Sequence, residues 1–217
     1  MNAREDILGR VRAGLGRNDH NRAGAEADVQ AAFATHSQGP RPQLGSELCA
    51  RFRHESEVMS STVDEVATLD EVPAAVARYL KANALGCEAV VWPRLAGLPW
   101  VEAGVAVHAR APRDADLVGI TGCFCALAET GTLMTCSAPD APASTSLLPE
   151  THIAVVPASR IVAGMEEGWA LVRAELGDLP RAVNFISGPS RTGDIEQTIV
   201  LGAHGPYRVH LILVRGA

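Results

Sequence analysis

Residues 119–135 read GITGCFCALAETGTLMT, and this stretch decides how the rest of the chain is organised. Its apolar start predicts a strand that ends at Thr121, which is also a candidate N-cap for one or two helical turns over residues 123–128. The turn sequence at residues 130–132 then predicts a second strand over residues 133–136. Strands and helical turns in close succession are typical of an α/β fold.

Glu129 is the only charged residue between Asp116 and Asp140. An ionised carboxylate buried among apolar side chains costs free energy unless hydrogen bonds compensate it. The hydroxyls of Thr130 and Thr132 are placed to supply such bonds. Glu129 is therefore a candidate functional carboxylate. The alternative is a structural acceptor that caps a turn, and spacing alone favours that alternative.

The composition limits the class of protein. The chain has 217 residues, of which 47% are hydrophobic, and this length suits one domain with an added arm. The formal net charge of −6 argues against nucleic acid as the main partner, because phosphate binding needs basic patches. No apolar run reaches the length of a membrane-spanning helix, and residues 1–12 lack the apolar block of a secretory signal. These features predict a soluble, cytoplasmic protein.

The five cysteines do not indicate a disulfide framework, because their number is odd and the chain is long. Cys123-x-Cys125 with Cys136 nearby matches neither a zinc ribbon nor a ferredoxin run, and no fourth ligand is close in sequence. We therefore expect these three cysteines to pack as small apolar side chains, and we predict no metal site in this chain.

The chain divides into two parts of different character. Residues 1–63 are predicted to form a helical arm and linker, with an amphipathic helix over residues 3–15 and a stretch rich in Gly, Ala and Pro over residues 14–46. Residues 64–217 are predicted to form an α/β domain whose strands pair in parallel. The expected helices of the whole chain after the first are 25–34, one resuming at Ser46, 74–84, 159–176 and 194–201. The other expected strands are 88–92, 100–108, 152–156, 183–186 and 209–214.

A second group of functional residue types lies at residues 186–194, ISGPSRTGD, between a predicted strand and a predicted helix. An open α/β sheet places its ligand crevice outside the carboxyl ends of its strands, so this loop is expected there. Arg191 can bind a carboxylate or phosphate with two hydrogen bonds. The alternative is a cap formed by Thr192 with Arg191 paired to a nearby acid, and the two interpretations stay open. The candidate binding residues of this loop are Ser187, Gly188, Ser190, Arg191 and Thr192.

His204 stands in the glycine turn of residues 201–206, LGAHGP, just before the last strand. A loop histidine between small residues can act as an acid–base or ligand group. The alternative, which we favour, is a turn residue whose ring nitrogens are satisfied. His152 and His210 lie within predicted strands and are expected to be structural.

Four motifs in the same order resemble the lactate-utilisation protein C family of LUD-domain proteins. They are AETGT at residues 128–132, SLLP at 146–149 with His152-Ile153, ISGPSRT at 186–192 with DIE at 194–196, and LGAHGP at 201–206. The resemblance implies a fold similar to the sugar-phosphate isomerase and CoA-transferase class, with a three-layer, mostly parallel sheet.

The resemblance also implies a function. It implies a non-redox subunit that supports the oxidation of L-lactate to pyruvate, with iron–sulfur clusters in partner subunits and no cofactor bound by this chain. A partner or a small carboxylate would then bind through the loop of residues 187–192, with Glu129 near the crevice and Thr130, Gly131 and Thr132 in the same turn as Glu129. The alternative function is a stand-alone isomerase or acyl-CoA-transferase-like enzyme with Glu129 as base or nucleophile. The mechanistic part of both functions depends on the loops of Glu129 and Arg191 meeting at one edge of the parallel sheet, whereas the family resemblance does not.

Overall fold

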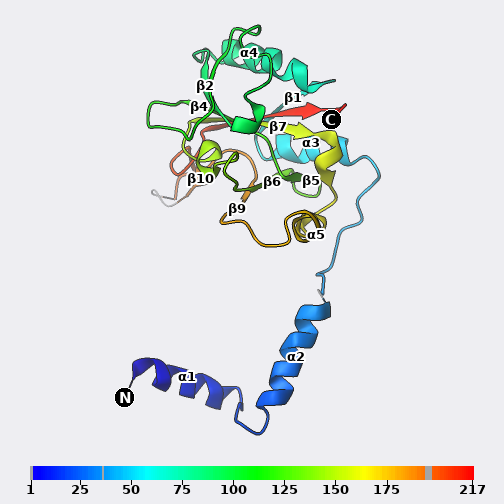
Figure 1. The fold of residues 1–217 in the computed structure, drawn as a ribbon, viewed down its shortest axis with the longest axis vertical. Helices are drawn as coiled ribbons and strands as arrows, with labels where there is room; N and C mark the ends of the chain where they lie inside the picture. The colour runs from blue at the N-terminus through cyan, green and yellow to red at the C-terminus, as the bar shows by residue number, and fades with distance from the viewer. Residues whose placement is uncertain (1, 36, 194–196) are drawn as a thin grey trace. The chain divides into compact units, whose positions relative to one another are not determined.

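The computed structural model describes residues 2–35, 37–193 and 197–217, which form two compact units (Figure 1). Unit 1 is Met1–Pro42 and unit 2 is Gln43–Ala217. The sequence placed this boundary between residues 63 and 64, about 20 residues later. The difference arises because the helix Leu48–Val58 buries Phe52 in the core of unit 2 and so belongs to the α/β domain.

Unit 1 contains the helices α1 (Ala3–Gly14) and α2 (Arg22–Thr35). Asn2 caps α1, because its side chain accepts a hydrogen bond from the Arg4 amide at 3.1 Å. Neither helix buries a residue, so the apolar stripe predicted for the first helix is exposed. α2 extends beyond the weak helix expected at residues 25–34.

The main sheet of unit 2 has six strands in the order β1-β12-β7-β4-β2-β3, and every neighbouring pair is parallel. This confirms the predicted mostly parallel α/β sheet. β7 and β12 are buried almost throughout, as strands covered on both faces must be. The strands are β1 (Thr62–Val66), β2 (Glu88–Val91), β3 (Ala106–His108), β4 (Val118–Thr121), β7 (Thr151–Pro157) and β12 (Arg208–Val214).

A second sheet has the order β8-β5-β6-β9, and a separate two-stranded ribbon joins β10 to β11. In the second sheet β6 pairs antiparallel with β5 and β9, whereas β5 pairs parallel with β8. These strands are β5 (Cys125–Leu127), β6 (Thr132–Cys136), β8 (Ile161–Val162), β9 (Val183–Ile186), β10 (Arg191–Thr192) and β11 (Val200–Leu201). The helices of unit 2 are α3 (Leu48–Val58), α4 (Val72–Ala82) and α5 (Met165–Glu175), with short 3₁₀ turns at η1 (Leu69–Glu71), η2 (Pro93–Leu95), η3 (Ala143–Ser146) and η4 (Ala158–Arg160).

The layers of unit 2 follow from which side chains face each other. α4 packs on one face of the main sheet through residues such as Val76 and Leu80. The opposite face meets α3 and the second sheet through Phe52 and Leu133. α5 covers the far side of the second sheet through Val172. Figure 1 shows this succession within unit 2 from α4, through the main sheet and the layer of α3, β5 and β6, to α5.

The structure corrects three expected helices. Residues 123–128 contain a strand, β5, because Gly131 reverses the chain and pairs residues 125–127 with β6. The expected helix 159–176 is helical only over α5, since Ile161–Val162 pairs with β5. The expected helix 194–201 ends in β11, which pairs with β10; residues 194–196 lie outside the described residues.

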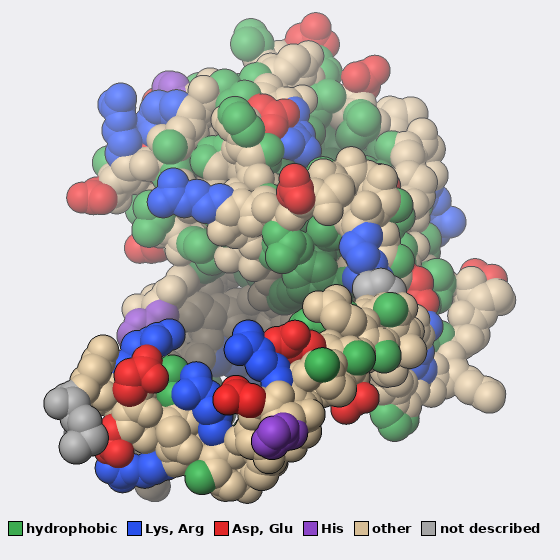
Figure 2. All heavy atoms as spheres, turned by 60° about the horizontal axis from the view of Figure 1, so that its bottom comes forward, with side chains coloured by type: hydrophobic (Ala, Val, Ile, Leu, Met, Phe, Trp, Pro, Cys, Tyr) green, Lys and Arg blue, Asp and Glu red, His purple; other side chains and the backbone are tan. Residues whose placement is uncertain are grey.

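The surface carries no large area of one charge on the face drawn in Figure 2, where basic and acidic side chains are interspersed. Among the described residues, no helix has both the length and the apolar character needed to cross a bilayer.

Candidate functional site

The turn of the β5–β6 hairpin rests directly on α3. Gly131 has φ +63°, and a Cβ atom at this position would overlap the backbone nitrogen of Ser56. The Ser56 hydroxyl donates to the Gly131 carbonyl at 3.2 Å. Glycine is therefore required at residue 131 by both the backbone conformation and the close approach of the helix.

A chain of three hydroxyls joins this hairpin to the loop after β9. The Thr130 and Thr132 hydroxyl oxygens are 2.7 Å apart, and that of Thr132 lies 2.5 Å from the Ser187 hydroxyl. The expectation that the two threonines would bond to Glu129 is wrong, because they bond to each other and to Ser187. The structure thus brings two motifs that are 55 residues apart into direct contact.

Glu129 lies on the other side of the hairpin, at the start of α5. Its amide donates to the Ala163 carbonyl at 2.9 Å, and its carbonyl accepts from Arg51 at 3.4 Å. The half-buried carboxylate faces Gly164, where a Cβ atom would lie 2.6 Å from Glu129 Oε2. The carboxylates of Glu166 and Glu167, in the first turn of α5, lie within 3.7 Å of the same Cβ position, so three acidic side chains meet at the start of this helix.

The loop after β9 is held by the last turn of α3. Gly188 has φ +74°, and a Cβ atom there would overlap the Met59 carbonyl oxygen. Arg191 donates to this same carbonyl at 3.2 Å and also to the Ser60 hydroxyl. The guanidinium therefore satisfies a carbonyl at the end of a helix, which a basic side chain commonly does. α3 was not assigned to the site from sequence.

Ser190, Thr192 and His204 lie in the connection that leads to β12. The Ser190 amide donates to the Pro206 carbonyl at 2.9 Å, and Thr192 is buried in β10. His204 is exposed and lines a cavity of about 600 Å³. The other side chains that line this cavity include Leu147, Leu148, Glu150, Tyr207 and Arg208.

These loops lie at the amino ends of the parallel strands, and the expected position at the carboxyl ends is wrong. The residues that hold Arg191 immediately precede β1, and the His204 cavity is lined by residues that immediately precede β7 and β12. The reason is that β9, which leads into this loop, belongs to the second sheet and pairs antiparallel with β6.

Glu129 and Arg191 contact the same helix at different places. Arg51, which bonds to the backbone of Glu129, and Met59, which bonds to Arg191, are two turns apart on α3, or about 12 Å at 1.5 Å per residue. Among the described residues no hydrogen bond or ion pair links Glu129 to Arg191. The two loops therefore share a support, while their charged groups stay separate.

Burial lowers the pKa of the two histidines that lie within strands. His152 is fully buried, its Nε2 lies 2.7 Å from the Thr121 hydroxyl, and burial lowers its pKa to about 4. His210 stacks on Tyr79, and burial lowers its pKa to about 4 as well. Both rings are neutral at neutral pH, as structural histidines within strands should be.

Burial also raises the pKa of the three clustered cysteines, to about 12 for Cys123 and about 11 for Cys125, with the same direction for Cys136. They are neutral thiols at pH 7, and Cys125 and Cys136 pack in the core beneath α5. No group of three or more His, Cys, Asp or Glu side chains arranged to hold a metal occurs among the described residues.

Comparison with known proteins indicates the class that this chain resembles. Residues 113–214 match the model of the LUD domain, which confirms the resemblance predicted from the motifs. A solved DUF162 family protein from Deinococcus radiodurans has the same fold, with a TM-score of 0.59 and 28% identity over 80% of this chain and 99% of that chain.

Several similar proteins from bacteria are named lactate utilization protein C. The one from Bacillus subtilis is 43% identical over 100 residues, and the one from Bacillus licheniformis is 40% identical over 100 residues. Each alignment covers 45% of this chain and 42% of the relative, so the matched region spans less than half of those proteins. The one from Anoxybacillus flavithermus is 27% identical over 97% of this chain and 98% of its own length.

Proposed function

We propose that this chain is a component of an L-lactate utilisation system, in which it supports the oxidation of L-lactate to pyruvate together with iron–sulfur partner proteins. The observation that carries this proposal is the match of residues 113–214 to a LUD domain, together with the names of the relatives. In this proposal the iron–sulfur clusters belong to the partner proteins, this chain binds no cofactor of its own, and the system works in the cytoplasm.

The geometry of the candidate site suits a role in binding. The hydroxyls of Thr132 and Ser187 are bonded to each other, and Arg191 is bonded to the end of α3. Side chains held in this way present a preorganised surface to a partner or a small carboxylate. Rigid loops on a packed scaffold are suited to recognition.

Reconstitution tests the proposal. The full chain would be co-expressed with the iron–sulfur proteins of the same organism, and L-lactate-dependent reduction of an artificial electron acceptor would be measured with and without it. We expect a stable complex on size-exclusion chromatography and a lactate oxidation rate that depends on this chain. No complex and an unchanged rate would contradict the proposal.

A Glu129→Gln variant separates an assembly role from a catalytic one. Because the carboxylate faces the start of α5, we expect this variant to keep complex formation and most of the lactate-dependent rate. Glu102→Gln, at an exposed acid elsewhere in the domain, is the matched control. Complete loss of rate in Glu129→Gln alone, with the complex intact, would instead favour the enzymatic alternative in which Glu129 is the base or nucleophile.

A further inference from the structure

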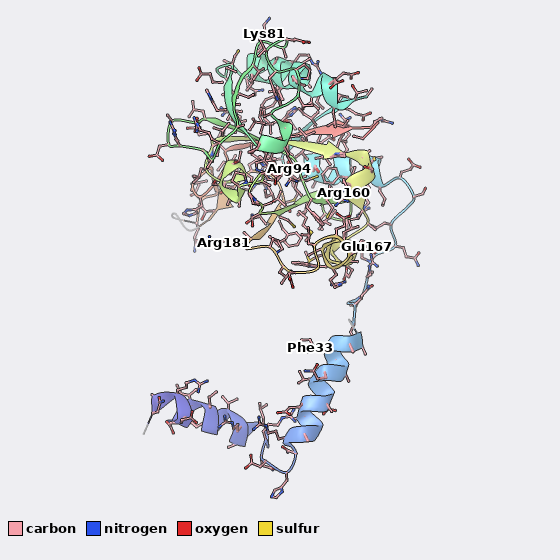
Figure 3. All side chains as sticks on the ribbon, in the orientation of Figure 1. Phe33, Lys81, Arg94, Arg160, Glu167 and Arg181 are labelled. Atoms are coloured by element: carbon pink, nitrogen blue, oxygen red, sulfur yellow. The ribbon has the colours of Figure 1, made fainter. Side chains whose placement is uncertain are left out.

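Three connections that follow neighbouring parallel strands meet at the carboxyl edge of the main sheet. Arg94 follows β2, Phe124 follows β4 and Arg160 follows β7. Arg160 Nε donates to the Phe124 carbonyl at 2.7 Å, and its guanidinium lies 4.9 Å from the centre of the Phe124 ring. Figure 3 labels Arg94 and Arg160 on their separate connections. This edge is opposite to the one that carries the motifs discussed above.

The order of the strands indicates that this position is a topological switch point of the main sheet. From β2 the chain continues outward to β3, whereas from β4 it continues inward to β7, so β2 and β4 flank the point at which the direction of winding reverses. Open α/β sheets bind ligands in the crevice at such a point, outside the carboxyl ends of the strands.

A cavity of about 270 Å³ lies at this point. Trp92 and Phe124 line it from the connections that follow β2 and β4, and Leu176, Asp178 and Pro180 line it from the connection between α5 and β9. Cys136 adds a thiol that burial keeps neutral. The cavity is therefore mostly apolar and is smaller than the pockets that hold drug-sized ligands.

Arg94 is the cation that lines this cavity, and its guanidinium contacts an aromatic ring and a carboxylate. Its guanidinium lies 5.4 Å from the centre of the Trp92 ring, and its Nε and Nη2 donate to the two carboxylate oxygens of Asp140 at 3.1 and 2.7 Å. Among the described residues Nη1 has no hydrogen-bond partner. A guanidinium held in this way can donate a hydrogen bond to one further carboxylate oxygen without losing its existing partner.

We propose that this cavity binds a small organic monocarboxylate, with its apolar body against Phe124 and Leu176 and its carboxylate at Arg94 Nη1. The cavity would bind such a compound whether or not the chain takes part in lactate utilisation, because the argument for the ligand uses only the lining residues.

Calorimetric titration of the full chain with 3-phenylpropanoate tests this site. We expect saturable binding with one site per chain, and much weaker or no binding of acetate, which lacks the apolar body, or of 3-phenylpropan-1-ol, which lacks the carboxylate. Saturable binding of 3-phenylpropylamine in place of the acid would overturn the proposal, because the acids Asp140 and Asp178 would then dominate the site. Absence of saturable binding of the acid would also overturn it.

Two variants and a control test whether the binding takes place at this cavity. Arg94→Gln should weaken binding about tenfold or more, as expected for the loss of one hydrogen bond to a charged group. Arg78→Gln removes an exposed arginine that pairs with Asp64 on the other side of the sheet and should leave binding unchanged. Leu176→Trp fills the mouth of the cavity at a half-exposed position and should abolish binding in a folded protein. Equal affinity in the wild type, Arg94→Gln and Leu176→Trp would exclude this cavity.

Discussion

His152 shows how strongly a single residue depends on its surroundings. It is fully buried in β7 and is bonded through Nε2 to Thr121, while its Nδ1 has no partner among the described residues. The folded state therefore opposes protonation of this ring, and its pKa is held at about 4, against about 6.5 in an unfolded chain.

This difference predicts an acid-sensitive fold. Between pH 6.5 and 4 the unfolded state binds more protons than the folded state, so stability is present above pH 6.5 and is lost as the pH falls. For His152 the loss by pH 5.0 should be about 2 kcal/mol. Urea unfolding at pH 7.5 and 5.0 would measure it in the wild type and in His152→Gln. The exposed His54→Gln is the control, and an identical pH dependence in all three proteins would refute this account.

Alanine substitutions at Gly131 and Gly177 separate the stability cost of backbone strain from that of a steric overlap. Both have positive φ, but only at Gly131 would a Cβ atom overlap a neighbour, the backbone of Ser56. We expect Gly177→Ala to cost about 1 kcal/mol, from strain alone. Gly131→Ala should cost clearly more, about 3 kcal/mol or above, because α3 must move. Denaturant unfolding of both variants would measure the two losses of stability. Equal losses would show that the hairpin does not rest on α3.

At the scale of elements, α3 decides where the domain begins. Its apolar spacing predicts a helix. Only the tertiary structure shows that Phe52 enters the core between the two sheets and that both candidate loops contact α3 or its C-terminal end. The strand β5 is a similar case. Its small residues suit a helix in isolation, and they form a strand because residues 125–127 pair with β6 and β8.

The packing of α3 can be measured directly. Phe52→Ala should destabilise unit 2 by about 3–5 kcal/mol, because a fully buried aromatic side chain is replaced by a cavity. Val58→Ala in the same helix, at a side chain that is 60% exposed, should change stability by about 0.5 kcal/mol or less. Thermal unfolding monitored by circular dichroism would compare them. A small effect of Phe52→Ala would mean that α3 belongs to the arm, as the sequence suggested.

At the scale of the whole molecule, the two units differ in how much they bury. Neither α1 nor α2 buries a residue, whereas unit 2 contains three apolar clusters. Between them, the described residues 37–46 form no helix or strand and are almost all exposed. Exposed backbone without secondary structure is where proteases cut first.

Limited proteolysis should therefore separate the units. A protease of low specificity is expected to cut first within unit 1 or residues 37–47 and to leave a resistant fragment that begins near Gln43. Mass spectrometry of the fragments would give its first residue. Early cuts within α3 or the main sheet would contradict the division of the chain into these units.

The sequence by itself determined the elements whose causes are local. Apolar runs rich in Val and Ile predicted β7 and β12, the helix expected over residues 74–84 overlaps α4, and the glycine turn predicted the reversal before β6. The four motifs were also sufficient to predict the resemblance to LUD-domain proteins, which the match of residues 113–214 confirms.

Only the tertiary structure decided at which edge of the main sheet the candidate loops lie, which groups the charged side chains bond to, and that residues 125–127 form a strand. Arg191 bonds to Met59, which is 132 residues away in the chain, and the fold of residues 125–127 depends on pairing with β6 and β8. Such contacts depend on which strand stands beside which, and local propensity and residue spacing do not carry that information.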